Sequence, residues 1–195
     1  MNAPMDEKLA PPGAGLPRLE LLVVRTLFGI HRWTGSRQSF DGRFAREREL
    51  IRALLRSCDA EAGARRVLIR RIAGLEDSSR YWSVWMTLEH LRIVNELLAL
   101  LIRELVLEVT PAGAASTAAV KPSADVGPEA LAAFETSCDA FAAAVAAAPS
   151  LKTHARYPHP WFGPLDAAGW HALAGMHMGI HRVQIERILS GLCRE

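Results

Sequence analysis

Residues 80–108 carry the clearest structural signal in the chain, and they read RYWSVWMTLEHLRIVNELLALLIRELVLE. Large apolar side chains and one histidine recur in this stretch at intervals of three and four residues. These positions are Met86, His90, Ile93, Leu97, Leu100 and Leu107. Such spacing places side chains on one face of an α-helix. We therefore expect one long helix over residues 80–108, with its apolar face packed against other helices.

The same spacing and the helix-breaking residues divide the rest of the chain. Further helices are expected over residues 17–33, 42–57, 60–72, 129–147 and 167–192. Gly74 is expected to close the short helix, Ser78 or Ser79 to cap residues 80–108, and Asp166 to cap the last helix. Prolines and glycines predict loops over 109–128 and 150–165, and no segment has the alternation of a strand. The sequence thus predicts an all-α, up-down four-helix bundle built from residues 17–57, 80–108, 129–147 and 167–192.

The first predicted helix is interpreted as a core helix. Its apolar positions Leu19, Val23, Thr26, Leu27 and Ile30 share one face. Charged residues interrupt the stretch, whereas a membrane-spanning helix needs about 20 predominantly apolar residues. The Pro- and Gly-rich residues 1–15 are expected to be a disordered leader, and residues 16–195 a single domain.

Composition narrows the classes of function. Of 195 residues, half are hydrophobic, and 23 basic against 21 acidic side chains give a formal net charge of +2. A nucleic-acid-binding protein needs a basic face with motif support, which is missing here, so we expect no nucleic-acid partner and no membrane partner. The three cysteines are far apart in the chain and form no C-x-x-C motif. That pattern is typical of the reducing cytoplasm, where we expect the protein to reside.

Three histidines form the candidate chemical site. His177 and His181 are one turn apart in the last predicted helix, on a stripe that should face the bundle axis. The stripe consists of Trp170, Ala174, His177, His181, Gln184 and Ile188. His90 occupies an inward position on residues 80–108. Each buried imidazole needs a partner, because an unsatisfied buried polar group costs about 1–3 kcal/mol.

One divalent metal ion would satisfy all three rings together. Three nitrogen ligands leave a coordination position open, which is the pattern of a catalytic rather than a structural site. Imidazole suits Zn, Ni, Fe or Cu; we expect Zn or Ni, with Fe as a further option. The competing interpretation is a pair of core or surface histidines that bind no metal, since an isolated His-x-x-x-His pair is common. The pair is not H-E-x-x-H, because Met178 stands where a zinc peptidase has its glutamate.

Other polar and aromatic residues are weaker candidates. Gln184 is one turn beyond the pair and is expected to hold a ligand or a bound water in place. His171 is rotated away from the stripe and is expected to point outward. Trp161 and Phe162, beside His159, either shape a pocket at the end of the bundle or simply plug its core. No carboxylate stands out as a general base, so a metal-bound water would have to serve.

At this point the residues resemble a known family. Residues 65–95, RRVLIRRIAGLEDSSRYWSVWMTLEHLRIVN, and residues 159–188, HPWFGPLDAAGWHALAGMHMGIHRVQIERI, are similar to the DinB/YfiT superfamily of metal-dependent bundle proteins. The shared features are the lone His90, the Gly-Pro-Leu lead-in at 163–165, Trp170, the His177 and His181 pair, and Gln184. The resemblance covers most of residues 42–192, which leaves residues 17–33 as an N-terminal helical extension.

The resemblance implies a four-helix bundle with a divalent ion on His90, His177 and His181, and a homodimer. Characterised members of this superfamily include transferases and isomerases that use small cytosolic thiols. Two functions are therefore carried forward. The first is a metal-dependent enzyme of the transferase or hydrolase type, in which the metal activates water or a small thiol toward a small-molecule substrate. The alternative is a non-catalytic, metal-stabilised binding or stress-response dimer.

Overall fold

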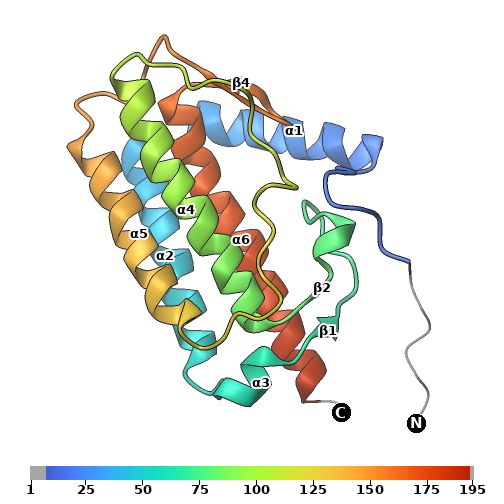
Figure 1. The fold of residues 1–195 in the computed structure, drawn as a ribbon. Helices are drawn as coiled ribbons and strands as arrows, with labels where there is room; N and C mark the ends of the chain where they lie inside the picture. The colour runs from blue at the N-terminus through green and yellow to red at the C-terminus, as the bar shows by residue number, and fades with distance from the viewer. Residues whose placement is uncertain (1–7, 194–195) are drawn as a thin grey trace.

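The computed structural model describes residues 8–193, which form a bundle of long helices with short strand pairs near its ends (Figure 1). The helices are α1 (Arg18–Thr34), α2 (Arg37–Leu55), α3 (Ala60–Ala64), α4 (Val84–Val106), α5 (Ala130–Ala147) and α6 (Ala167–Leu192). The strands are β1 (Val67–Leu68), β2 (Tyr81–Trp82), β3 (Tyr157–His159) and β4 (Gly163–Leu165). A 3-10 turn covers Asp77–Ser79.

Helices α2, α4, α5 and α6 form the bundle. Helix α4 packs along both α5 and α6, and α2 packs along α6. The core between them is apolar, and its largest fully buried side chains include Leu88, Leu91, Ile102, Phe134, Phe141 and Ile185. Asp166 caps α6 as expected, since its side chain accepts a hydrogen bond from the backbone N–H of Gly169. The four-helix bundle predicted from the sequence is confirmed.

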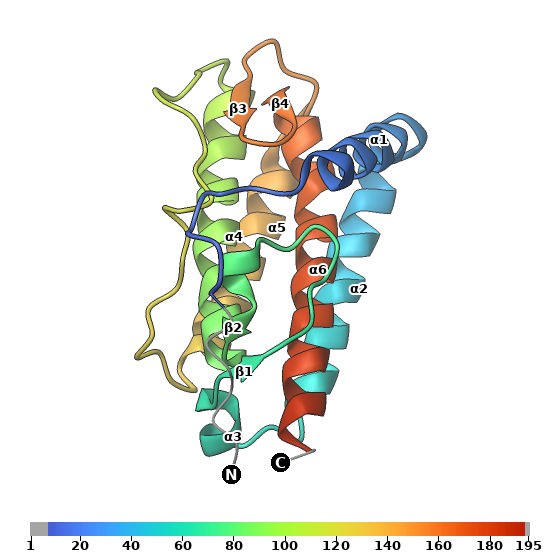
Figure 2. The same ribbon diagram turned by 90° about the vertical axis from the view of Figure 1, so that its right-hand side faces the viewer.

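The connection between α4 and α5 is a crossover that runs back along the bundle (Figures 1 and 2). Glu108, just after α4, accepts hydrogen bonds from the backbone N–H groups of His154 and Ala155, which follow α5. Both helices therefore end at the same end of the molecule, and they run parallel. A single long crossover is one of the known connectivities of four-helix bundles, and it replaces the up-down order of successive helices that the sequence predicted between α4 and α5. It carries residues 107–129 past the middle of α4, where the site lies.

Two local predictions are wrong. The short helix predicted over 60–72 ends at Ala64, and α4 starts at Val84 with Ser83 as its cap, rather than after Ser78 or Ser79. Between these two helices, β1 pairs antiparallel with β2, and between α5 and α6 a second short pair forms from β3 and β4. These strands have only two or three residues each. That is too short for an alternating hydrophobic pattern to be visible in the sequence.

The interpretation of the first helix as a core helix is also wrong. Helix α1 lies across one end of the bundle (Figure 2), and within it Phe28 is the buried residue, stacked against Phe162. The apolar residues expected to face the core, such as Leu19 and Ile30, are exposed. The polar side chains face the bundle instead, where Glu20 pairs with Arg71 and Arg32 with Asp166. The burial of Phe28 and these two ion pairs together orient this helix.

The inner stripe of α4 differs in part from the prediction. Met86 and His90 are buried as expected, but Leu97 and Leu100 are about half exposed, and Leu107 is 75% exposed. The face that packs in the core is rotated, and it uses Leu91, Leu98, Ile102 and Leu105. Leu97 and Leu100 line a cavity beside the bundle core, which explains why these apolar side chains are partly exposed.

Helix α5 is long and apolar enough, by length and composition alone, to cross a membrane, with a mean hydropathy of 1.3. Its Phe134, Cys138 and Phe141 are buried in the bundle core. A core helix of a soluble bundle passes the same test, and the packing along α4 explains the composition of α5.

The predicted leader, residues 1–15, falls partly outside the described residues, which begin at residue 8. The backbone N–H of Ala10 donates to Asp77, and those of Gly13 and Gly15 donate to Glu76. The described part of this segment is therefore attached to the turn that precedes β2.

Glycines let α2 approach α6 closely. A Cβ atom on Gly175 would lie 3.1 Å from Arg43 Cγ and 3.2 Å from the backbone nitrogen of Phe44, whereas a Cβ on Gly42 would meet nothing within 4 Å. We predict that Gly175→Leu lowers the free energy of unfolding by about 1–3 kcal/mol, because the larger side chain forces the helices apart. The matched control, Gly42→Leu, should be neutral or stabilising by up to about 1 kcal/mol. Urea denaturation followed by circular dichroism measures both, and equal stability of the two variants would contradict the close contact.

Candidate metal centre

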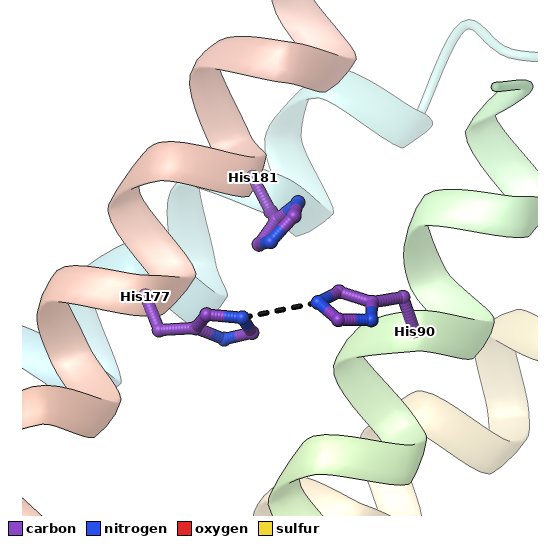
Figure 3. A group of neighbouring side chains, drawn as sticks. All are labelled: His90, His177 and His181. Carbon is purple, nitrogen blue, oxygen red and sulfur yellow. Dashed lines mark hydrogen bonds between the residues drawn. The ribbon is translucent and has the colours of Figure 1, made fainter. Parts of the chain in front are cut away.

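The three predicted histidines converge inside the bundle (Figure 3). His90 comes from α4, and His177 and His181 come from α6. One ring nitrogen from each lies within 4.8 Å of those of the other two. The Nε2 atoms of His90 and His177 are 3.1 Å apart. The sequence-predicted residues are thus brought together at one point.

The placement follows from the local structure of α6. An interval of four residues puts His177 and His181 on one face, one turn apart, with ring centroids 4.5 Å from each other. The predicted stripe is inward: Trp170, Ala174, His181, Gln184 and Ile188 are buried. His177 is half-buried, because it borders the cavity beside the bundle.

The crossover orients His90. Its Nδ1 lies 2.7 Å from the backbone carbonyl oxygen of Val120. A carbonyl oxygen can only accept, so His90 Nδ1 carries the proton and donates it. In the neutral ring the Nε2 lone pair is then free, and it faces the other two histidines. Trp82 packs against the His90 ring with a centroid distance of 5.2 Å and limits its rotation.

Gln184 orients His181 in the same way. Gln184 Nε2 donates to the backbone carbonyl of Ser79 at 2.7 Å, so its Oε1 is the atom that faces His181 Nδ1, also at 2.7 Å. His181 Nδ1 therefore donates, and its Nε2 lone pair is free. Trp82 stacks on the His181 ring, with 9° between the planes. The supporting role expected for Gln184 agrees with these contacts.

Burial keeps the three rings neutral. It lowers the pKa of His90 to about 4 and the pKa values of His177 and His181 well below the usual histidine value, and the neighbouring imidazoles lower the latter two further. A histidine must be neutral to bind a metal ion, so the protonation state is already the correct one at neutral pH.

The donor set fits a divalent metal. Two nitrogen ligands of one tetrahedral zinc, each about 2.0–2.1 Å from the metal, lie roughly 3.3 Å apart. The 3.1 Å between His90 Nε2 and His177 Nε2 is close to that separation. Outer hydrogen bonds from Nδ1 to a backbone carbonyl or an amide are the arrangement that commonly supports histidine ligands. Three protein ligands would leave a coordination position for a water or a substrate atom.

A cavity of about 390 Å³ adjoins the three histidines. Leucines of α4 and α6 line its sides, and residues of the β3–β4 hairpin line one end. His159, Trp161 and Phe162 are among the hairpin residues, so the pocket-forming interpretation of this segment holds. A volume of this size lies within the range of small-molecule pockets, about 300–1,000 Å³.

Sequence reasoning missed a buried ion pair next to the centre. Lys121 Nζ is 2.9 Å from Glu76 Oε2, and it also donates to the hydroxyls of Ser78 and Ser79. Burial acts to raise the pKa of Glu76, but hydrogen bonds from Lys121 and Thr117 outweigh it and lower that pKa. Glu76 and Lys121 lie in segments that the sequence predicted only as a turn and a loop. Such segments have no hydrophobic periodicity from which the pairing could have been predicted.

His171 does not point outward as expected. It is 1% exposed and packs edge-on against Phe40, with a centroid distance of 5.6 Å. His171 lies on a different face of α6 from His177 and His181, as expected. That face packs against α2 rather than facing solvent, because α6 contacts both α2 and α4. It is not part of the histidine group at the centre.

Comparisons with known proteins agree with this architecture. The family model described as the DinB superfamily matches residues 43–185, a span that includes all three histidines. A solved structure, the crystal structure of TT2238, a four-helix bundle protein, is 23% identical with a TM-score of 0.56. The match covers 77% of this chain and 98% of that one, and at this identity it bears on the fold alone. No curated protein matches the chain.

The hydrogen bonds of Gln184 lead to a prediction about metal affinity. Gln184→Met keeps the volume of the side chain but removes the acceptor for His181 Nδ1, so the affinity for Zn²⁺ should fall about 10- to 100-fold. Gln184→Glu keeps an acceptor there and should retain more of the affinity. Competition with a chromophoric chelator measures these values.

Gln38→Met is the matched control, because Gln38 is exposed on α2. Its affinity should equal that of the wild type. An unchanged affinity in a folded Gln184→Met variant would mean that Gln184 does not orient a ligand.

Proposed function

The chain belongs to the DinB superfamily, and from this premise we propose that it is a divalent-metal-dependent enzyme of the transferase or hydrolase type. The ligands would be His90, His177 and His181. A divalent cation bound there lowers the pKa of a water or a small thiol, so that the nucleophile is available at neutral pH. The proposal rests chiefly on one observation: three neutral imidazoles converge at the wall of a cavity large enough for a small molecule.

The chain's own residues would orient the ligands and shape the reaction space. Val120 and Gln184 hold the Nδ1–H groups of His90 and His181, which leaves both Nε2 atoms turned inward. The apolar walls exclude bulk water, and that exclusion strengthens electrostatic interactions inside the cavity. Glu76 is bound to Lys121 and so is not free to act as a general base. The proton of the nucleophile would then pass to solvent water, and a bound cation would make that loss favourable at neutral pH.

The cytoplasmic location stays a prediction. The structure leaves Cys58, Cys138 and Cys193 as free thiols, which agrees with the expectation of a reducing compartment.

We predict that the purified protein holds one equivalent of Zn²⁺ or Ni²⁺, and that His90→Ala loses it. The metal-loaded protein should transfer a thiol to an electrophilic bimane, with cysteine or glutathione as the thiol, or hydrolyse p-nitrophenyl acetate. His177→Ala should abolish turnover, because one ligand of the cation is lost. Elemental analysis and absorbance assays measure both properties.

His154→Ala is the control, since His154 is exposed on the loop before the β3–β4 hairpin. It should keep both metal and activity. Metal that is bound and lost with His90, but without turnover above the His177→Ala background, would favour the non-catalytic, metal-stabilised alternative. Full metal content in His90→Ala would exclude His90 from the site.

A further inference from the structure

The cavity beside the three histidines has almost entirely apolar walls. Leu97, Leu100 and Leu101 of α4 and Leu173, Met176 and Ile180 of α6 form its sides. Aromatic rings of the β3–β4 hairpin and of α6 close one end: the His159 ring lies 4.8 Å from Phe162 and 5.2 Å from Trp170 between centroids. Such walls favour the binding of apolar groups, because each ligand methylene that is buried contributes about 0.8 kcal/mol to the free energy of transfer from water.

The charges that line the cavity do not favour an anion. Lys121 is the one Lys or Arg among its described lining residues, and Glu76 neutralises it at 2.9 Å. Glu104 adds a further carboxylate to the lining. Away from the three histidines, where a bound cation would attract an anion, a ligand with several carboxylates would have to leave water without a counterion, which is unfavourable. The cavity is therefore suited to an uncharged molecule.

Two of the lining residues can offer a ring N–H group to a ligand, Trp170 and His159. His159 Nδ1 accepts a hydrogen bond from the backbone N–H of Trp161 at 3.0 Å, so a neutral His159 carries its proton on Nε2. Burial lowers the pKa of His159 to about 4, and the ring is neutral at physiological pH. Trp170 is 5% exposed, and its Nε1 is buried without a partner. A buried donor such as the Trp170 Nε1–H is normally satisfied, by protein, water or ligand, and the Nε2–H of the half-buried His159 ring is a second donor beside it.

We propose that the cavity binds a neutral, largely apolar molecule that carries a carbonyl-type acceptor, such as an ester, and that His159 Nε2–H donates to that acceptor. The proposal rests on the proposed function, because it names the substrate class for the same site. The apolar part of the ligand lies along the leucines of α4 and α6, while the acceptor lies at the hairpin end. His159 is then a residue that determines ligand specificity without being a metal ligand.

The test uses metal-free protein, so that binding is separated from metal content and turnover. The neutral fluorescent probe N-phenyl-1-naphthylamine reports occupancy, and methyl octanoate, octanoate and glutathione compete with it. The ester should displace the probe at least tenfold more effectively than octanoate or glutathione. His159→Phe should weaken ester binding about 3- to 10-fold, the value of one hydrogen bond, and change probe binding less than twofold.

Two further variants complete the test. His159→Gln keeps an N–H donor and should restore most of the ester affinity, and His154→Phe, outside the cavity, should change nothing. Equal competition by octanoate or glutathione, no probe binding, or an unchanged ester affinity in His159→Phe would each overturn the proposal. None of these outcomes affects metal binding by the three histidines, which elemental analysis decides separately.

Helix α1 carries a second, independent observation. Its outer face exposes six large apolar side chains: Leu19, Leu22, Val23, Leu27, Ile30 and Trp33, of which Trp33 is 87% exposed. Complete burial of these side chains would cover at most roughly 800 Å² per chain, about the area that each partner buries in an interface of standard size. Exposed apolar patches of this extent mark interaction sites.

We infer that this face binds the same face of a second copy of the chain. Identical faces related by a two-fold axis are the usual geometry of homodimers, and an apolar helix face is complementary to itself. Attraction to an anionic lipid surface would need free Lys or Arg beside the apolar face. Of the three arginines of α1, Arg25 is engaged with the carbonyl of Trp161 and Arg32 with Asp166, which leaves the exposed Arg18 as a single positive charge, too few for such attraction.

Sedimentation velocity between 1 and 100 µM tests this interface. The wild type should be a dimer, and Leu22→Glu and Ile30→Glu should be monomers with unchanged circular dichroism. Leu107→Glu, at a leucine that follows α4 and is more exposed than Leu22 and Ile30, is the control and should remain a dimer. A monomeric wild type, or a dimer that both variants retain, would overturn the inference. A monomer that floats with phosphatidylcholine vesicles would assign the face to lipid instead.

Discussion

Two hydrogen bonds decide what the centre of this bundle can do. His90 donates from Nδ1 to the carbonyl of Val120, and His181 donates from Nδ1 to Gln184. Each bond fixes which ring nitrogen carries the proton and leaves the other lone pair directed at a shared point. Without them, buried imidazoles could rotate or exchange tautomers, and a shared cation site would be lost. The remainder of the fold can be understood as the framework that supplies these two acceptors.

That framework joins segments that are distant in the sequence. The crossover brings Val120 to α4, and the turn before β2 brings the Ser79 carbonyl to Gln184. Glu76 then ties these parts together, because its one carboxylate accepts from Lys121 and Thr117 of the crossover and from the backbone of Gly13 and Gly15. A buried carboxylate with this many donors is satisfied without a catalytic task. Its role is to hold the loops that orient the ligands.

The sequence was sufficient to predict the helices whose apolar residues recur at regular intervals. The spacing of apolar residues predicted α4, α5 and α6, and the four-residue interval predicted that His177 and His181 share a face. It failed where orientation depends on distant partners. Leu19 and Ile30 have core spacing, but α1 turns them to solvent because Glu20 and Arg32 pair with the bundle. The acceptor for His90 is the main-chain carbonyl of Val120, and Lys121 pairs with Glu76 beside the centre; nothing in the local sequence marks either of these loop residues.

The central claim is that three imidazoles bind one divalent cation in a site with an open position. X-ray absorption spectroscopy at the metal edge of the Zn²⁺-loaded protein tests it most directly. The account predicts three imidazole nitrogens at about 2.0–2.1 Å and one oxygen ligand in the first coordination shell. A shell of oxygen atoms only, without the outer-shell scattering of imidazole rings, would contradict it.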